Sequence, residues 1–321
     1  MHTIGVLSVW LATAQWTRCT PSHYTCILLE NGFFRYGKSP RDPCKKLYAR
    51  NITSILFIGD SYVRHAYQGV AAVLTRNFDD ASLVHGAPLE CRGARQTEFA
   101  KCRFHLNTTI TACGITLSAR IGHTPIPRVY PNDFLEHTVI VWGFGNHPSD
   151  SAWGDGDRPT IGDVQAYTQD VLLPTCRCVP PLAINHVIRS HLDNFEQDCV
   201  PWSSEWSKRV VFLQSHFRPS PGRYAGETRE AQQLFFDRMP EAIRTVCNIT
   251  RMVDTYTPTR QLASHGGAMK YAADTAHWGW AVNLVKAEIL LDALSRAQSS
   301  FPGPSGPSPT ASRKVDPKFA E

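Results

Sequence analysis

The chain has 321 residues, of which 42% are hydrophobic and 19% are charged. It can therefore bury the core of one large domain or two ordinary ones, unlike a disordered protein. The net charge is +5 and the basic residues are scattered. A nucleic-acid-binding protein typically has a concentrated basic stripe, so we expect no nucleic-acid partner. No apolar stretch approaches the ~18 residues that span a bilayer, so we expect no multi-span membrane part.

The chain begins like a secreted protein. A short apolar run at residues 4–11 precedes the small residues Ala12 and Ala14, which predicts a signal peptide over residues 1–14, although an amino-terminal core strand is the alternative. We expect a cysteine-bearing lead-in over residues 15–50 and a folded domain over 51–296. The Pro-, Ser- and Gly-rich segment 297–321 is typical of a disordered tail.

The folded domain alternates strands and helices. Strands are predicted at residues 52–58, 115–121, 138–142, 210–213 and 252–253. Helices are predicted at residues 62–74, 163–173, 227–247 and 278–297, the last with one apolar face. This order favours an α/β protein, a three-layer α/β/α sandwich with a mostly parallel central sheet. In such sheets reactive groups gather in the loops at the carboxyl ends of the strands.

Ten cysteines lie at positions 19, 26, 44, 91, 102, 113, 176, 178, 199 and 247. An even number in a chain with a signal peptide predicts disulfides, and zinc is disfavoured because the single close pair, Cys176 and Cys178, has no matching pair. Short loops favour Cys91 with Cys102, and Cys44 with Cys19 or Cys26.

Three Asn-x-Thr tripeptides fit the pattern for N-glycosylation, at Asn51, Asn107 and Asn248. Together with the cysteines they predict that the protein is secreted or lies in the lumen of the secretory pathway, either the Golgi or the extracellular side.

Gly59-Asp60-Ser61 joins the first strand to the first helix. A serine at the amino end of a helix lies beside backbone N–H groups that favour negative charge, as a nucleophile for acyl transfer requires. Such a nucleophile also needs to be exposed. The alternative is that Asp60 or Ser61 simply caps the helix.

A base and its orienting carboxylate are predicted just before the last helix. Asp274 and His277 are three residues apart at the end of a loop rich in Gly and Ala, residues 266–276. Histidine is the usual base for a serine hydroxyl, and a carboxylate holds it in place. The alternatives are an N-cap at Asp274 and packing of His277 against Trp278. His65 and His147 are rival bases that we interpret as surface or packing residues.

Asn146 follows the strand at 138–142 in a Gly-x-Gly-Asn setting. Its amide can donate to an oxyanion, although a glycine-rich turn with Asn in the left-handed region is the alternative.

Gly59-Asp60-Ser61, Asn146 and Asp274-x-x-His277 together resemble the SGNH (GDSL-like) hydrolase superfamily. The closer likeness is to its PC-esterase branch, which includes the trichome-birefringence-like plant polysaccharide O-acetyltransferases and the capsule-associated and sialate O-acetyltransferases. The stretches from Cys26 to Cys44 and from Cys91 to Cys102 are also similar to that branch.

The resemblance implies an SGNH-like catalytic domain over residues 51–296, with Ser61 as nucleophile, His277 as base and Asp274 as its orienter. It implies oxyanion donors at the Ser61 backbone N–H, at Asn146 and at a glycine, which is Gly93 or Gly86.

The expected function is acyl-ester chemistry on glycans. An acetyl-serine would pass its acetyl group to a sugar hydroxyl, and the resemblance favours this O-acetyltransferase; transfer to water, by a carbohydrate acetyl esterase, is the alternative. A non-catalytic glycan-binding module is a further alternative, and a serine peptidase fits the spacing less well. We expect a glycan or polysaccharide partner and no bound cofactor or metal, with an acetyl donor such as acetyl-CoA as a substrate.

Two kinds of side chain are weaker candidates for substrate binding. Arg218 follows the strand at 210–213 and could hold a carboxylate or phosphate, or form a surface ion pair. Trp278 could stack on a sugar ring or pack in the core, as could the tryptophans at 153, 202, 206 and 280.

Overall fold

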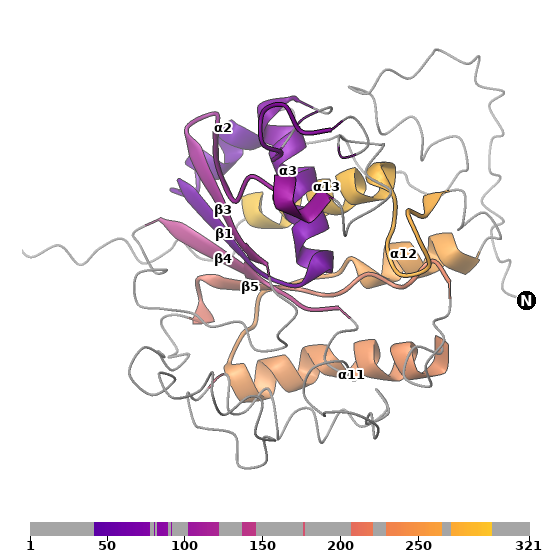
Figure 1. The fold of residues 1–321 in the computed structure, drawn as a ribbon. Helices are drawn as coiled ribbons and strands as arrows, with labels where there is room; N and C mark the ends of the chain where they lie inside the picture. Colours follow the sequence, from indigo (N-terminus) through magenta and orange to yellow (C-terminus); the bar gives the residue numbers. More distant parts are fainter. Residues whose placement is uncertain are drawn as a thin grey trace, which may run out of the picture.

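The structure is a computed structural model, and Figure 1 shows its fold. It describes residues 42–77, 80, 82–88, 91, 102–121, 137–145, 176, 207–220, 229–264 and 271–296. The predicted signal peptide, most of the lead-in, the helix at 163–173 and the tail lie outside these residues.

The described residues contain one six-stranded sheet in the order β2-β3-β1-β4-β5-β6. The strands are β1 Ser54–Gly59, β2 Thr109–Ala112, β3 Ile115–Ile121, β4 Thr138–Trp142, β5 Val210–Leu213 and β6 Met252–Val253. All neighbours are parallel except β2, which pairs antiparallel with β3. The prediction of an α/β protein with a mostly parallel sheet is confirmed.

Helices lie on both faces of the sheet (Figure 1). They are α2 Pro43–Tyr48, α3 Ser61–Thr75, α11 Arg229–Cys247, α12 Tyr256–Ser264 and α13 Trp280–Ser295, with a short 3-10 helix at Arg103–His105. Because side chains alternate along a strand, Ile55 and Phe57 of β1 pack with α3 and α13, whereas Leu56 and Ile58 pack with the apolar stripe of α11. The sheet is therefore buried on both sides, which explains its continuous apolar strands.

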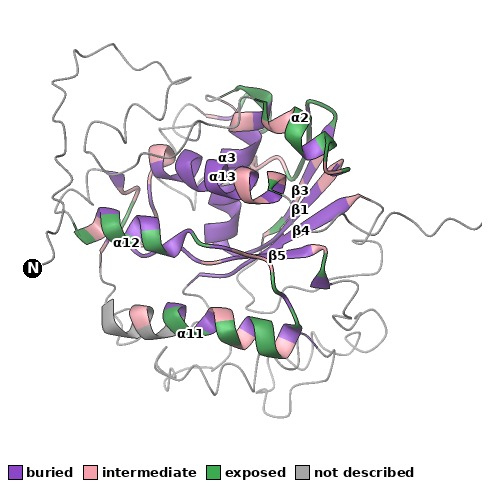
Figure 2. Cartoon of the chain, turned by 180° about the vertical axis from the view of Figure 1, so that it is seen from behind, coloured by how far each residue is buried: buried purple, intermediate pink, exposed green. Residues whose placement is uncertain are grey.

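The helices α3 and α13 cross at close distance on the face of the sheet that holds Ile55 and Phe57. A Cβ atom on Gly69 of α3 would lie 2.6 Å from the carbonyl oxygen of Asn283 of α13, so only glycine allows this approach. Figure 2 shows that α3 is buried along most of its length. The crossing fixes α3, which carries Ser61, against α13, which follows the loop of Asp274 and His277.

The last helix differs from its prediction. The sequence predicts one apolar face and a polar side that faces solvent, but α13 is buried nearly all round, including the polar side chains of Asn283, Lys286 and Glu288. In the structure Asn283 and Lys286 have buried hydrogen-bond partners, which removes most of the cost of burying them.

Three disulfides join described residues. The predicted pair Cys91–Cys102 is confirmed, but Cys44 pairs with Cys113 and not with Cys19 or Cys26. The reason is tertiary: Cys113 and Gly114 form the two-residue turn between β2 and β3, and this turn lies against α2, where the Tyr48 hydroxyl donates to the Cys113 carbonyl at 3.0 Å. The third disulfide joins Cys176 to Cys247 at the end of α11.

The order in which the chain adds strands to the sheet reverses at β1. The chain leaves β1 for β3 on one side and then returns to β4 on the other. The carboxyl ends of β1, β4 and β5 therefore meet at one edge, the position where α/β proteins place their binding crevices. The loops after these three strands begin at Asp60, Gly143 and Gln214.

Candidate functional site

Asp60 starts α3 and connects it to the loop after β4. Its carboxylate caps the helix by accepting the N–H of Tyr62 at 2.9 Å, and it also accepts the N–H of Gly145. The capping role that the sequence left open between Asp60 and Ser61 thus belongs to Asp60. Because the cap is satisfied by its neighbour, the Ser61 hydroxyl is left for another partner.

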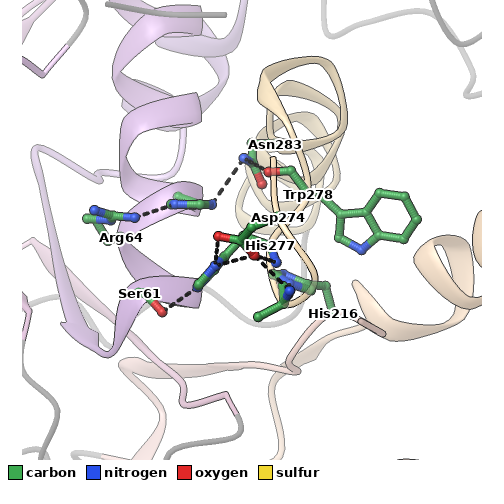
Figure 3. Close-up of polar contacts among 9 residues, drawn as sticks. Ser61, Arg64, His216, Asp274, His277, Trp278 and Asn283 are labelled. Atoms are coloured by element: carbon green, nitrogen blue, oxygen red, sulfur yellow. Dashed lines mark hydrogen bonds and ion pairs between the residues drawn. The ribbon is translucent and has the colours of Figure 1, made fainter. Parts of the chain in front are cut away.

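That partner is His277. Ser61 Oγ lies 2.8 Å from His277 Nε2, although the residues are 216 positions apart (Figure 3). Ser61 lies at the first turn of α3 and His277 in the loop before α13. Ser61 is only 2% exposed, which differs from the exposure expected of a nucleophile. Bulk water therefore has little access to this hydroxyl.

The other nitrogen of the same ring faces Asp274. His277 Nδ1 lies 3.0 and 2.9 Å from the two carboxylate oxygens. Since a carboxylate only accepts, Nδ1 carries the proton and Nε2 presents a lone pair to the Ser61 hydroxyl. The structure therefore brings together the three residues that the sequence predicted as nucleophile, base and orienter. The order of contacts is the one that general-base activation of a serine requires.

Asp274 is held as a carboxylate. Partial burial alone would raise the pKa of Asp274, but hydrogen bonding to His277 and the charge of His277 outweigh burial. The backbone N–H groups of Ala276 and His277, each 2.7 Å from the carboxylate, act in the same direction and leave the pKa below its usual value. The side chain of Asp274 is 43% exposed and that of His277 13% exposed, so the outer end of the triad reaches solvent.

Two glycines allow the close contacts between the segments after β1 and β4. A Cβ atom on Gly59 would lie 2.1 Å from the Gly143 carbonyl oxygen, and one on Gly145 would lie 2.5 Å from the ring of Tyr62. Both positions therefore require glycine. Gly145 is the residue before Asn146, the predicted oxyanion donor, and Asn146 itself lies outside the described residues.

His216 is part of the site, although no motif in the sequence indicated it. It lies three residues after the end of β5. Its ring stacks on Tyr62 at 3.8 Å between centroids, and its Nε2 lies 3.0 Å from the Ala276 carbonyl oxygen. Burial, followed by the charge of Lys286, holds the pKa of His216 well below its usual value. Its position at the carboxyl end of a buried strand was the signal that could have pointed to it.

Lys286 of α13 was also missed. It is 2% exposed, and its Nζ lies 2.8 Å from His216 Nδ1 and 3.1 Å from Asn283 Oδ1. Burial lowers the pKa of Lys286 to about 7. The negative charge of Asp60 raises this pKa and the positive charge of Arg64 lowers it, but both effects are smaller than that of burial. No sequence signal identifies this residue, because a lysine on a helix is usually exposed.

The predicted rival base His65 is a packing residue. It is buried in α3, its ring contacts Arg64 and lies 3.2 Å from Asn283 Nδ2, and burial holds its pKa well below the usual value. Its centroid is 5.0 Å from that of His277. The other rival, His147, lies outside the described residues.

The two weaker substrate-binding candidates are buried. Trp278 is 0% exposed and its indole N–H donates to the Phe217 carbonyl at 2.6 Å. This overturns the prediction that Trp278 stacks on a sugar, because its ring faces are already packed in the core. Arg218 is also buried, so the alternative of a surface ion pair is wrong, and its predicted role toward a substrate stays a prediction.

The remaining predicted residues are placed as follows. Gly93 lies outside the described residues, and Gly86 lies in an exposed turn with a φ of 80°. Asn51 and Asn248 are exposed, next to the amino ends of β1 and β6 and away from the carboxyl ends that carry the triad. Asn107 is half-buried, just before β2.

No protein-family model matches the chain, and no curated protein shows significant similarity to it. None of the helices in the described ranges is long and apolar enough to cross a membrane. The part of the chain that the structure describes also contains no group of three or more His, Cys, Asp or Glu side chains arranged to hold a metal ion.

Proposed function

We propose that this protein is an acyl-transfer enzyme of the SGNH type that acts on acetyl esters of glycans through Ser61, His277 and Asp274. One observation carries the proposal: Ser61 Oγ lies 2.8 Å from the nitrogen of His277 that faces away from Asp274. Helices on both faces of a mostly parallel sheet support an SGNH-like three-layer fold. The motif resemblance supports the PC-esterase branch.

The proposed chemistry has two steps. His277 Nε2 takes the proton of the Ser61 hydroxyl as Oγ bonds to the acetyl carbonyl carbon, and the leaving group departs with that proton. In the second step a sugar hydroxyl gives its proton to His277 and attacks the acetyl-serine, and Ser61 Oγ leaves and takes the proton back. Asp274 stabilises the imidazolium that forms in each step. The Ser61 backbone N–H, at the start of α3, is the proposed oxyanion donor within the described residues.

Transfer to a glycan is favoured over hydrolysis for a physical reason. With Ser61 only 2% exposed, the acetyl-serine would form where bulk water has little access, so a bound acceptor competes well with water. The three disulfides support a protein of the secretory pathway, because structural disulfides persist in oxidising compartments.

The test is mass spectrometry of the purified protein after incubation with acetyl-CoA or p-nitrophenyl acetate. We expect an added acetyl group on the peptide that contains Ser61, and its movement to added oligosaccharides. Ser61→Ala should abolish both, whereas Ser118→Ala, at a half-buried serine in β3, should abolish neither. Release of acetate without acetylated sugar would identify an esterase. Donor turnover by folded Ser61→Ala at the wild-type rate would overturn the proposal.

A further inference from the structure

Three consecutive carbonyl groups around His277 accept hydrogen bonds that fix the backbone of this loop. The Ala276 carbonyl lies 3.0 Å from His216 Nε2, and the His277 carbonyl accepts the N–H of Ala273 at 2.9 Å. The Trp278 carbonyl accepts the side-chain amide of Asn283 at 2.8 Å. Two of these three donors are therefore side chains from outside the loop.

Both of these side chains receive a hydrogen bond from Lys286. A carbonyl only accepts, so the neutral ring of His216 carries its proton on Nε2 and presents a lone pair at Nδ1, where Lys286 Nζ lies at 2.8 Å. Lys286 Nζ also donates to Asn283 Oδ1 at 3.1 Å. Two chains of hydrogen bonds thus run from one amine to the carbonyl groups on either side of His277 (Figure 3 shows His216, His277 and Asn283).

The geometry points to Lys286 as a positioning residue. Through His216 and Asn283 it fixes the carbonyl groups of Ala276 and Trp278, and so the position of His277 between them. This inference rests on the proposed function, because it assigns Lys286 a role in the reaction through His277. The hydrogen bonds of Lys286 to His216 and Asn283 offset part of the free-energy cost of burying its amine. Lys286 holds His216 and Asn283 rather than Ser61, and it therefore acts through the loop.

Small displacements of a base have large effects on rate. A shift on the order of 1 Å in the position of a catalytic group costs about 100-fold in rate. Lys286→Met, which keeps the length of the side chain without its donors, should therefore lower kcat for p-nitrophenyl acetate hydrolysis about 10- to 100-fold and change KM less than about twofold. Glu288→Gln is the matched control, because it removes another buried charge from α13 and position 288 lies about 200° around the helix from position 286.

A double-mutant cycle separates positioning from a general structural role. If Lys286 acts through His277, then Lys286→Met should lower the residual rate of His277→Ala less than about twofold, because no base remains to be misplaced. Losses that multiply in the double variant would overturn the inference. So would a wild-type kcat for Lys286→Met.

Two substitutions of His216 test the same chains without touching the lysine. The Gln side-chain amide nitrogen occupies roughly the place of Nε2, so His216→Gln keeps a donor for the Ala276 carbonyl, whereas the shorter Asn does not reach it. We expect His216→Gln to retain at least about tenfold more activity than His216→Asn, and equal activities would overturn the inference if Lys286→Met does not fold. Ser61→Ala in the same assay separates the two proposals. If it is inactive while Lys286→Met is not, only the positioning role fails; if it is active, both fail.

Discussion

Asp274 holds both the ring and the backbone of His277. One carboxylate oxygen lies 3.0 Å from Nδ1 and 2.7 Å from the backbone nitrogen of the same residue. Asp274→Asn keeps an acceptor for the backbone but places an amide beside the ring, which favours the wrong tautomer. We expect kcat to fall roughly 10³- to 10⁴-fold with little change in KM, measured by steady-state hydrolysis of p-nitrophenyl acetate. A kcat within tenfold of wild type would remove Asp274 from the mechanism.

Lys286 should make the stability of the protein depend on pH above neutrality. Its pKa is about 7 in the fold and about 10.4 in the unfolded chain. Between these values the unfolded chain binds a proton that the folded protein does not, so the free energy of unfolding rises with pH. Relative to Lys286→Met, the wild type should gain roughly 1 kcal/mol per pH unit from pH 7 to pH 9. Urea unfolding at several pH values measures this, and parallel curves would contradict it.

Asp60 should contribute more to the free energy of unfolding than an ordinary helix cap does. Asp60→Ala removes the cap of α3 and the acceptor of the Gly145 N–H together, so we expect a loss of about 2–4 kcal/mol in the free energy of unfolding. The matched control is Asp254→Ala, which removes the exposed carboxylate that accepts the N–H of Thr257 in α12 at 2.8 Å and should cost about 1 kcal/mol. Equal losses in urea titrations would show that the contact with Gly145 contributes nothing.

The disulfides should differ in the stability that they provide. Cys44 and Cys113 are separated by 69 residues and Cys91 and Cys102 by 11. The entropy of loop closure in the unfolded chain predicts that replacing the first pair by alanine costs about 4 kcal/mol and replacing the second about 3 kcal/mol. Thermal unfolding of the two double variants checks the order. The reverse order would mean that local packing, rather than loop length, sets their contributions.

Much of the sheet could be predicted because its strands are buried on both faces. Thr138–Trp142 and Val210–Leu213 are continuous apolar runs and have the predicted bounds in the structure. β2 was missed because it is a short edge strand with exposed threonines, and such a strand lacks both an apolar run and a clear alternation. The partner of Cys44 was wrong for a related reason, since loop length ignores the sheet that carries Cys113 to α2.

Some residues of the candidate site could likewise be predicted from the sequence and others could not. Ser61, Asp274 and His277 could be predicted because their residue types and local spacing match a known chemistry. Lys286 and His216 could not, because they come from elements 70 positions apart and their pairing exists only in the folded chain. A polar residue on a helix predicts exposure, and only the crossing of α3 and α13 shows that Lys286 is enclosed.

At the start of α3, Asp60 caps the helix and the neighbouring Ser61 hydroxyl contacts His277, which has a practical consequence. Because Asp60 begins the helix, the adjacent hydroxyl can be removed without disturbing the local backbone. The Ser61→Ala variant should therefore crystallise in the native shape and retain an intact donor or oligosaccharide long enough to be seen in electron density. The sugar that such a trap captures would identify the physiological ligand directly.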